Sequence, residues 1–443
     1  MRNIFLIILL FVVANTHAQN KVDVLVLGAS AAGAACAIQA ARSAEGAPGG
    51  LKIMLIEASE NLLSGVNPTF NEPAYDSGIW KEWQEAYHLS NDTLKNGKIK
   101  MAKVSELRFF KNTAVKTNAQ NTLQQIVKNL KNLTFHKNTQ VLGIVAKKNG
   151  WVVKVLLNGL IQEIKTKILV DATEYAHVSP LSKYGIIKLS DEGKINSLVT
   201  YSPIEPNKNI YRTSIGAGTN GTALYYFPAG MFIPLGKENL MVITAQTNTV
   251  GFDKNAFNNI ALQLSLGQGA GVLAAYAPFF GIALKDANVR VLQSEVLNYK
   301  GQLLPIKDVA VQDSAYKALQ QVIISGFFKL NMDNGLFYPD SLVSMNEIKP
   351  IMNELYTRSK IWYLENTTAV LNLENIIALI SFISAREVID ISPEISSKWN
   401  KKYGFNTPFD IKKPLTRKQF ALVVNDYLQP YKVRVNFNGD FLK

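Results

Sequence analysis

An aliphatic segment that leads through a glycine-containing turn into an alanine-rich stretch is the feature that most constrains this chain. Residues 22–27 are mostly aliphatic, as expected for a buried parallel strand. Residues 28–33 (Gly-Ala-Ser-Ala-Ala-Gly) follow directly, and residues 34–42 favour a helix. A second aliphatic segment, residues 51–56, ends on Glu57. This order of strand, tight turn, helix, strand and acid predicts a βαβ unit that binds a dinucleotide.

The residues of this unit have separate expected roles. Gly28 permits the tight turn, and the small side chains of Ser30 and Ala32 let a pyrophosphate approach the start of the helix beside Gly33. Glu57 lies where a carboxylate accepts hydrogen bonds from ribose hydroxyls. Ser30 replaces the middle glycine of the usual G-x-G-x-x-G pattern, so a βαβ unit that binds no nucleotide is the alternative for these residues alone.

The turn and the alanine-rich helix resemble one group of FAD-dependent oxidoreductases, whose members are sometimes labelled xanthan lyase. The resemblance extends over roughly residues 22–305. Later segments follow in the family's order: a loop at 61–66, a strand at 133–141, a hairpin at 151–166, a strand at 167–174 and a strand at 237–243 that precedes glycines in 267–271. The resemblance implies an α/β fold, with a Rossmann-like FAD-binding domain at 19–305 and an interleaved small β-rich substrate cap at approximately 184–235.

The resemblance also implies a set of residues that bind FAD. Val141 would face the adenine through its backbone, and the helix near Gly267 would point its N-terminus at the flavin. NAD remains open as an alternative, because Glu57 suits either ribose. No catalytic residue is assigned, because a flavin needs the protein chiefly to position the ring and exclude side reactions. The implied cofactor-binding residues are Gly28, Ser30, Ala32, Gly33, Glu57, Val141, Ala172, Thr173, Gly267, Gln268 and Gly269.

Two departures from the family pattern keep a second interpretation open. The pair Ala176-His177 stands where the family has Gly-Asp, and Ala245-Gln246 stands where it usually has Gly-Arg. The first interpretation is an enzyme that transfers a hydride or electron pair from a small-molecule or saccharide-like substrate to FAD. The second is a scaffold protein that has lost the cofactor and acts through a C-terminal glycan-binding module. Arg212 is a candidate for holding an anionic substrate, and sheet packing is the alternative for the tyrosines near it.

The first eighteen residues have the layout of a secretory signal peptide. A basic start at Arg2 precedes the unbroken apolar run 4–13, and Ala18 is a small residue suited to cleavage. The run is shorter than the ~20 apolar residues that cross a bilayer. We therefore expect an exported protein, periplasmic or extracellular, with no transmembrane anchor after cleavage. A buried N-terminal strand is the alternative.

The charge and the metal-ligating residues narrow the set of partners. Lysine and arginine (47) exceed aspartate and glutamate (34) and give a net charge of +13. In an exported protein this excess suits acidic glycans, anionic surfaces or solubility rather than nucleic acid. The single cysteine, Cys36, excludes a disulfide framework, and the four histidines lack metal-ligand spacing. We expect no metal site.

Residues 306–443 predict a separate, mainly α-helical module. Amphipathic helices are expected at 314–325 and 373–388, and capping boxes at Ser344 and Thr416 predict two further helix starts. This pattern resembles the S-layer-homology repeat, which implies that Arg417 presents its guanidinium to an anionic cell-wall glycan. A plain helical domain with capped helices explains the same residues, and both interpretations stay open.

Overall fold

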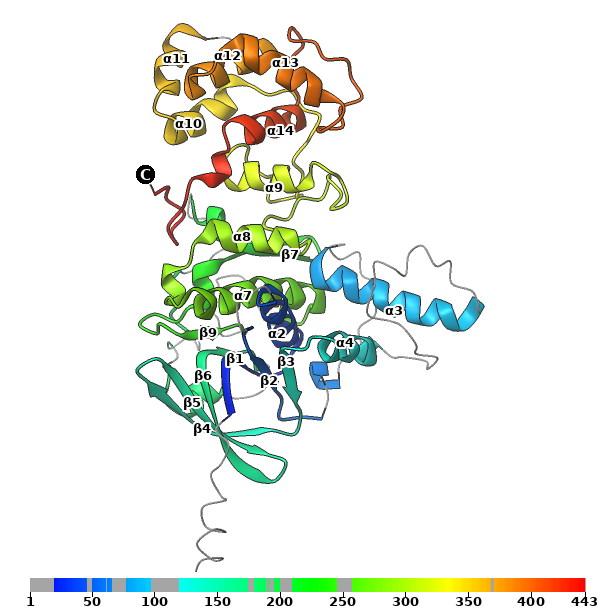
Figure 1. Ribbon diagram of the computed structural model, residues 1–443, viewed down its shortest axis with the longest axis vertical. Helices are drawn as coiled ribbons and strands as arrows, with labels where there is room; N and C mark the ends of the chain where they lie inside the picture. The colour runs from blue at the N-terminus through cyan, green and yellow to red at the C-terminus, as the bar shows by residue number, and fades with distance from the viewer. Residues whose placement is uncertain are drawn as a thin grey trace, which may run out of the picture.

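A mixed β-sheet with helices on one face forms the first part of the chain, and shorter helices form the last part (Figure 1). The structure is a computed structural model. It describes residues 20–45, 50–60, 62–65, 77–96, 119–173, 179–188, 190, 195–199, 209–244, 257–367 and 370–442. The predicted fold class, an α/β domain followed by a mainly helical region, is confirmed.

The sheet contains parallel strands in the order β3-β2-β1-β6, and β9 pairs in parallel with the other edge of β6. Successive side chains of a strand point to opposite faces. Val24 and Val26 of β1 pack under the helices, while Leu25 and Leu27 contribute to a second core on the other face. Burial on both faces explains why the strand reads as an aliphatic run. The bounds are β1 Asn20–Leu27, β2 Ile53–Ile56, β3 Leu133–His136, β6 Leu160–Asp171 and β9 Leu240–Val242.

An antiparallel extension uses the first half of β6. Strand β5 (Gly150–Leu157) pairs with β6, and β4 (Gln140–Lys147) pairs with β5. Asn158 and Gly159 connect β5 to β6 with positive φ angles of 52° and 76°, as a type I′ hairpin turn requires. The predicted hairpin is confirmed. The single strand expected at 133–141 is wrong, because β3 ends at His136 and the chain turns before β4 begins.

Two helices, α2 (Ala31–Ser43) and α7 (Ile260–Phe280), pack closely on the sheet. A Cβ on Gly267 would overlap the carbonyl oxygen of Ala32, and one on Gly271 would lie close to that of Cys36. These glycines therefore allow the two helices to approach. By length and composition α7 is the one helix of the described chain that could cross a membrane, but 78% of its apolar stretch is buried inside the protein.

The remaining elements before residue 300 flank this core. In Figure 1, α3 projects away from the sheet, and the two-stranded sheet β7-β8 lies near α7 and α8. Gly216 and Gly218 of β7 allow it to lie against α7, since a Cβ at either position would crowd Ser265 or Leu262. The bounds are η1 Leu62–Gly65, α3 Gly78–Asn96, α4 Ala119–Lys128, α5 Pro180–Lys183, η2 Ile210–Thr213, β7 Ser214–Asn220, β8 Ala223–Pro228, η3 Ala229–Phe232, η4 Leu284–Asp286 and α8 Val289–Asn298.

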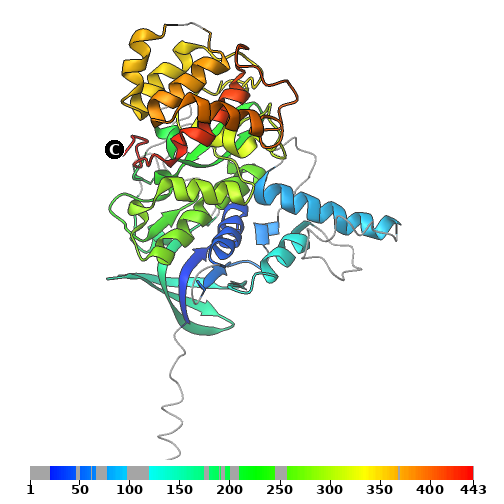
Figure 2. The same ribbon diagram turned by 45° about the horizontal axis from the view of Figure 1, so that its top comes forward.

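Short helices form the end of the chain, and Figure 2 shows them gathered at one end of the molecule. The predicted helix starts at Ser344 and Thr416 are confirmed, and both residues form capping boxes. The single helix expected at 373–388 is wrong, because α12 ends at Ser384 and the next helix begins at Val388. The bounds are α9 Tyr316–Ile324, α10 Met345–Leu355, α11 Ser359–Glu365, α12 Leu373–Ser384, α13 Val388–Trp399, α14 Arg417–Tyr427 and η5 Pro430–Lys432.

Three short extended segments in this part form a ring of backbone hydrogen bonds. Val343 N–H donates to Leu415 O at 2.9 Å, Leu415 N–H to Leu371 O at 3.0 Å, and Leu371 N–H to Val343 O at 3.4 Å. The residue after each is the N-cap of a helix, in a capping box: α10, α12 and α14. The region is therefore built from three equivalent segments, of which the sequence indicated two.

Candidate functional site

The turn after β1 is held tightly against the end of β6. Gly28 has a φ of +91°, and a Cβ there would lie 2.8 Å from the backbone atoms of Ala172 and Thr173. Only glycine suits this conformation and this close approach. Ala172 N–H in turn donates to Leu27 O at 2.8 Å. The structure thus brings Gly28, Ala172 and Thr173 together, at the carboxyl ends of two neighbouring parallel strands.

Ser30 and Gly33 fix the start of α2. Ser30 is the N-cap, and its hydroxyl accepts the Gly33 N–H at 3.1 Å and donates to Ala172 O at 2.8 Å. The serine side chain therefore points toward β6 rather than over the turn. A Cβ on Gly33 would overlap Gly28 O. Both residues pack the turn closely enough for the N-terminus of the helix to face a ligand.

Glu57 holds the other side of the turn. Its Oε2 accepts the Ala29 N–H at 2.6 Å, and its Oε1 accepts the Ser59 N–H at 2.9 Å. The residue is partly exposed, so its carboxylate retains lone pairs for a further donor. Its backbone oxygen accepts the Thr139 N–H at 2.8 Å, which places the start of β4 beside the turn.

Most backbone N–H groups of the turn have an acceptor among the described residues, and those of Ser30 and Ala31 do not. Glu57 accepts from Ala29, the side chain of Gln263 accepts from Ala32 at 3.3 Å, and Ser30 accepts from Gly33. Within the described part of the chain, the N–H of Ala31 has no acceptor, although only 4% of this residue is exposed. A buried N–H at a helix N-terminus needs a partner. Its position suits an anionic group of a ligand.

A buried carboxylate lies just beyond the turn, at the end of β6. Asp171 accepts hydrogen bonds from the hydroxyl of Ser179 and from the N–H and hydroxyl of Thr173, at 3.1 and 2.7 Å for the last two. Burial raises the pKa of Asp171, and these hydrogen bonds act in the opposite direction. The hydroxyl of Thr173 donates to Asp171. A contact between Thr173 and a cofactor would therefore be made by the backbone of Thr173.

Val141 lies at the start of β4, after the turn that contacts Glu57. Its carbonyl oxygen accepts the hydroxyl of Tyr184 at 2.9 Å. A carbonyl oxygen has two lone pairs, so the tyrosine leaves room for one further donor. The backbone of Val141 thus lies on the same side of the turn as Glu57.

Comparisons with known proteins bear on this geometry. Residues 23–188 match the FAD dependent oxidoreductase family, and this stretch contains the turn, Glu57, Val141 and the end of β6. This match indicates an FAD-dependent oxidoreductase with FAD as its cofactor. No curated protein matches the chain.

Similarity of the chain to solved structures is low. Bacillithiol disulfide reductase from Bacillus cereus is 16% identical with a TM-score of 0.21, over 35% of this chain and 40% of that chain. The p-nitrophenol 4-monooxygenase from Pseudomonas putida is 11% identical with a TM-score of 0.30, over 64% and 85%. A flavoprotein/dehydrogenase from Cytophaga hutchinsonii is 14% identical with a TM-score of 0.33, over 71% and 95%. The chain spans less than half the length of the Bacillus cereus protein.

The residues around the turn of the oxidoreductase domain fit FAD. The N–H of Ala31 suits the pyrophosphate, and Gly28 and Gly33 keep bulk away from it. Glu57 would suit the adenosine ribose, and the backbone of Val141, beyond the turn that contacts Glu57, would then face the adenine. The methyl group of Ala32 is too small to block the helix start.

The expected positions of Gly267, Gln268 and Gly269 are wrong. Helix α7 begins at Ile260 behind the N-cap Asn259, so these residues lie in the interior of the helix. The two glycines pack against the backbone of neighbouring elements. The buried amide of Gln268 accepts the Ile79 N–H at 3.3 Å and donates to Tyr299 O at 3.2 Å. Their contacts are those of packing residues.

Arg212, a candidate for holding an anionic substrate, is paired with a carboxylate of the chain itself. Its guanidinium forms a double hydrogen bond to Glu354 of α10, at 2.9 and 3.0 Å. The ring of Phe441 lies under it, 4.3 Å from the guanidinium carbon. The arginine therefore joins η2 to α10 and to the end of the chain. The pairs Ala176-His177 and Ala245-Gln246 lie outside the described residues.

Two residues of the site, Gln263 and Ala31, were not predicted from the sequence. Gln263 reaches the start of α2 across 231 positions of sequence, and nothing in its local pattern indicates this. Ala31 carries the free N–H, but its side chain is ordinary for a helix. Nearly every residue type has a backbone N–H, so the residue type does not show which N–H binds a ligand. Only the place of Ala31, directly after the turn, could have indicated this donor.

Proposed function

We propose that this chain is an exported FAD-dependent oxidoreductase that transfers a hydride or electron pair from a small-molecule or saccharide-like substrate to the flavin. The observation that carries the proposal is the turn at Gly28, where a free helix N–H and a ribose-facing carboxylate lie on the two sides of one cradle. The family match over residues 23–188 supports FAD as the group this cradle takes.

Each residue of the cradle has a definite task in this proposal. The N–H of Ala31 binds a phosphate oxygen, while Ser30 and Gln263 hold the neighbouring N–H groups and keep the helix start in shape. Glu57 orients the adenosine ribose and anchors the turn through Ala29. When bound, FAD supplies the two-electron acceptor chemistry. The protein positions the flavin ring and excludes water from it.

Export rests on the sequence of residues 1–18, whose charged start and short apolar run are typical of a signal peptide. A periplasmic or extracellular place is consistent with a single buried thiol, Cys36. The C-terminal helices resemble S-layer-homology repeats in their capped helix starts. This likeness and the resemblance to proteins labelled xanthan lyase favour a carbohydrate setting and an anionic cell-wall glycan as a further partner.

The visible absorption spectrum of the purified protein tests the proposal first. Flavin bands near one FAD per chain, with FAD identified after release by denaturation, are the expected result. Bleaching of these bands then serves as the readout for a screen of saccharides and small reductants. A colourless protein that takes up no added FAD would refute the enzyme and favour a scaffold that has lost its cofactor.

A substitution at Gly28 tests the site itself. Gly28→Val places a branched side chain at a φ of +91° against the backbone of Ala172 and Thr173, so we expect FAD content to fall to background. Gly159→Val is the matched control, because Gly159 also has a positive φ of +76° but no atom within 4 Å of a Cβ. Circular dichroism checks that both variants fold. Full flavin content in a folded Gly28→Val protein would refute the assignment.

A further inference from the structure

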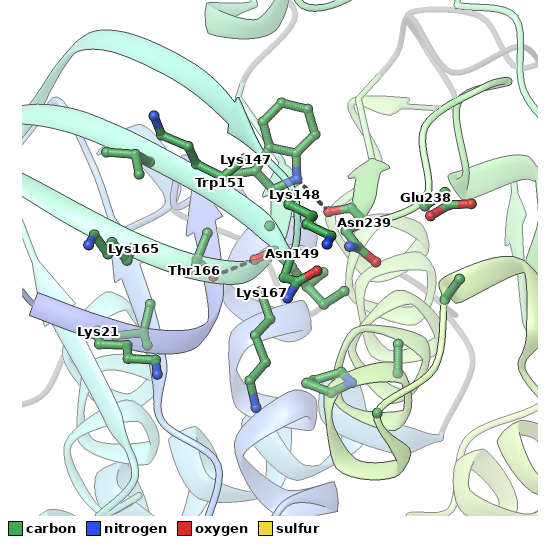
Figure 3. Close-up of a pocket in the computed structure, with 18 of the residues that line it drawn as sticks. Lys21, Lys147, Lys148, Asn149, Trp151, Lys165, Thr166, Lys167, Glu238 and Asn239 are labelled. Carbon is green, nitrogen blue, oxygen red and sulfur yellow. Dashed lines mark hydrogen bonds between the residues drawn. The ribbon is translucent and has the colours of Figure 1, made fainter.

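A basic pocket opens at the end of the sheet opposite the cofactor turn (Figure 3). Its volume is about 640 Å³, within the range of small-molecule sites. The walls come from the start of β1, the β4–β5 turn, the middle of β6, the segment before β9 and the end of α7. The lysines that line it are Lys21, Lys147, Lys148, Lys165 and Lys167.

Most of the positive charge in the pocket lacks a carboxylate partner. Lys167 pairs with Asp23 at 2.8 Å. Among the described residues, the other four lysines form no ion pair. Lys21 and Lys165 are register partners on neighbouring strands, and both are exposed. Like charges so placed repel one another. An anion bound in the pocket would relieve this repulsion.

The opposite wall has different chemistry. In Figure 3, Glu238 and Asn239 lie on the side of the pocket away from Lys21 and Lys165, and Lys148 and Asn149 lie close to Asn239. The buried Trp151 also lines the pocket, and its indole N–H donates to Asn239 O at 2.9 Å. Glu238 is itself paired with Lys285 at 3.3 Å, outside the lining. Amides and a carboxylate accept hydrogen bonds from hydroxyl groups, and the carboxylate repels a ligand that is anionic throughout.

We propose that this lysine pocket binds an acidic saccharide, a sugar chain with carboxylate or sulfate groups. The anionic groups lie against the lysines, and the hydroxyl groups lie against Asn239 and Glu238. Lysine suits this role because its ammonium is a compact, mobile charge that needs no fixed planar partner. The pocket therefore recognises the charge and the hydroxyl groups of the saccharide and does not require one rigid ligand geometry.

The pocket is separate from the cofactor site. Gly28 follows Lys21 by seven positions along β1 and its end, which is about 23 Å at ~3.3 Å per residue. The saccharide is therefore held away from the turn at Gly28. The inference does not depend on the proposed function, and flavin content reports on that function independently.

Isothermal titration of the full chain with trigalacturonate at low ionic strength tests the proposal. We expect binding that weakens as salt rises, since the attraction is electrostatic, and no binding of the neutral trisaccharide maltotriose. Lys147→Gln/Lys165→Gln should weaken binding roughly tenfold or more. The matched control is Lys131→Gln/Lys329→Gln, two exposed lysines elsewhere, which should bind as the wild type does. Thermal melting and FAD content should be the same in all three proteins.

Three results would overturn the proposal. The first is no heat of binding for trigalacturonate or for a sulfated heparin disaccharide at low salt. The second is equal loss of affinity in the pocket and control variants, which would assign binding to net charge alone. The third is inositol hexakisphosphate binding at least as tightly as either saccharide after correction for charge, which would show that the hydroxyl-facing wall contributes nothing.

Discussion

Removing Glu354 should destabilise the protein more than removing its partner Arg212, although the two share one ion pair. Only 6% of the Arg212 side chain is exposed, against 41% for Glu354. A second buried guanidinium, Arg290, lies close enough to act on the first. Burial lowers the pKa of Arg290 to about 10, and the charge of Arg212 contributes to that shift. Glu354 pairs with Arg212 alone, so Arg212 carries its charge beside a second buried cation that has no carboxylate partner among the described residues.

The magnitudes follow from this asymmetry. Glu354→Ala leaves the buried Arg212 without a carboxylate, and breaking a buried pair in this way costs about 3 kcal/mol or more. Arg212→Met leaves Glu354 half-exposed, where water solvates it, and relieves the repulsion on Arg290. The methionine also packs on Phe441. We therefore expect a loss of only about 1 kcal/mol, the range of an exposed ion pair.

Urea denaturation of the full chain, followed by tryptophan fluorescence and far-UV circular dichroism, measures both losses. Glu365→Ala is the control, since Glu365 is an exposed glutamate on the neighbouring helix α11 and should change the free energy of unfolding by less than about 0.5 kcal/mol. The double variant Glu354→Ala/Arg212→Met should be more stable than Glu354→Ala alone. Equal losses in the two single variants would refute the reasoning from burial.

Two further predictions concern single side chains. The raised pKa of Asp171 favours the protonated carboxyl group in the folded state. The contribution of Asp171 to the free energy of unfolding therefore falls as pH rises from the ordinary pKa of aspartate through the raised pKa in the folded protein. Asp171→Asn should remove that slope, measured as the difference between variant and wild type in urea unfolding from pH 4 to 7; parallel curves would contradict it. Arg417→Met should lower the free energy of unfolding by about 1 kcal/mol, while Glu347→Ala, which leaves Arg417 unpaired and removes a helix cap, should lower it by about 3 kcal/mol. Thermal melts that rank these two variants in the opposite order would contradict this.

The β1–α2 unit could be predicted because its signals are local. A strand buried on both faces must be aliphatic, a turn at positive φ must be glycine, and the acid at Glu57 ends the next strand along the chain. Each requirement acts on residues within some 30 positions of one another. The same holds for the hairpin at Asn158 and for the capping boxes of α10 and α14.

The start of α7 could not be predicted in the same way. The helix is buried nearly all round, so it lacks a polar face that would mark its limits. Glycines allow a ligand to approach a backbone, and they equally allow a second helix to do so. Gly267 allows α2 to approach α7. A glycine that allows a helix to approach has the same residue type as one that allows a ligand to approach, so the sequence does not distinguish them. The N-cap at Asn259 was the one available signal.

Long-range contacts account for the other failures. Arg212 and Glu354 are 142 positions apart. From the sequence alone, an arginine that binds a substrate cannot be distinguished from one that joins two parts of the chain. The third capped segment, at Asn372, was missed because its box uses Asn375 in place of the usual Glu or Gln. Only the ring of hydrogen bonds shows that it is equivalent to the segments at Ser344 and Thr416.

That equivalence explains why Arg417 turns inward. The position after each N-cap is occupied by Met345, Leu373 and Arg417, and the first two are buried. The arginine occupies a position that the other two segments fill with apolar side chains. It is accommodated there because Glu347 of the first segment pairs with it and Phe337 O accepts its N–H at 2.7 Å. An anionic glycan at the C-terminal helices would therefore meet exposed lysines rather than this guanidinium.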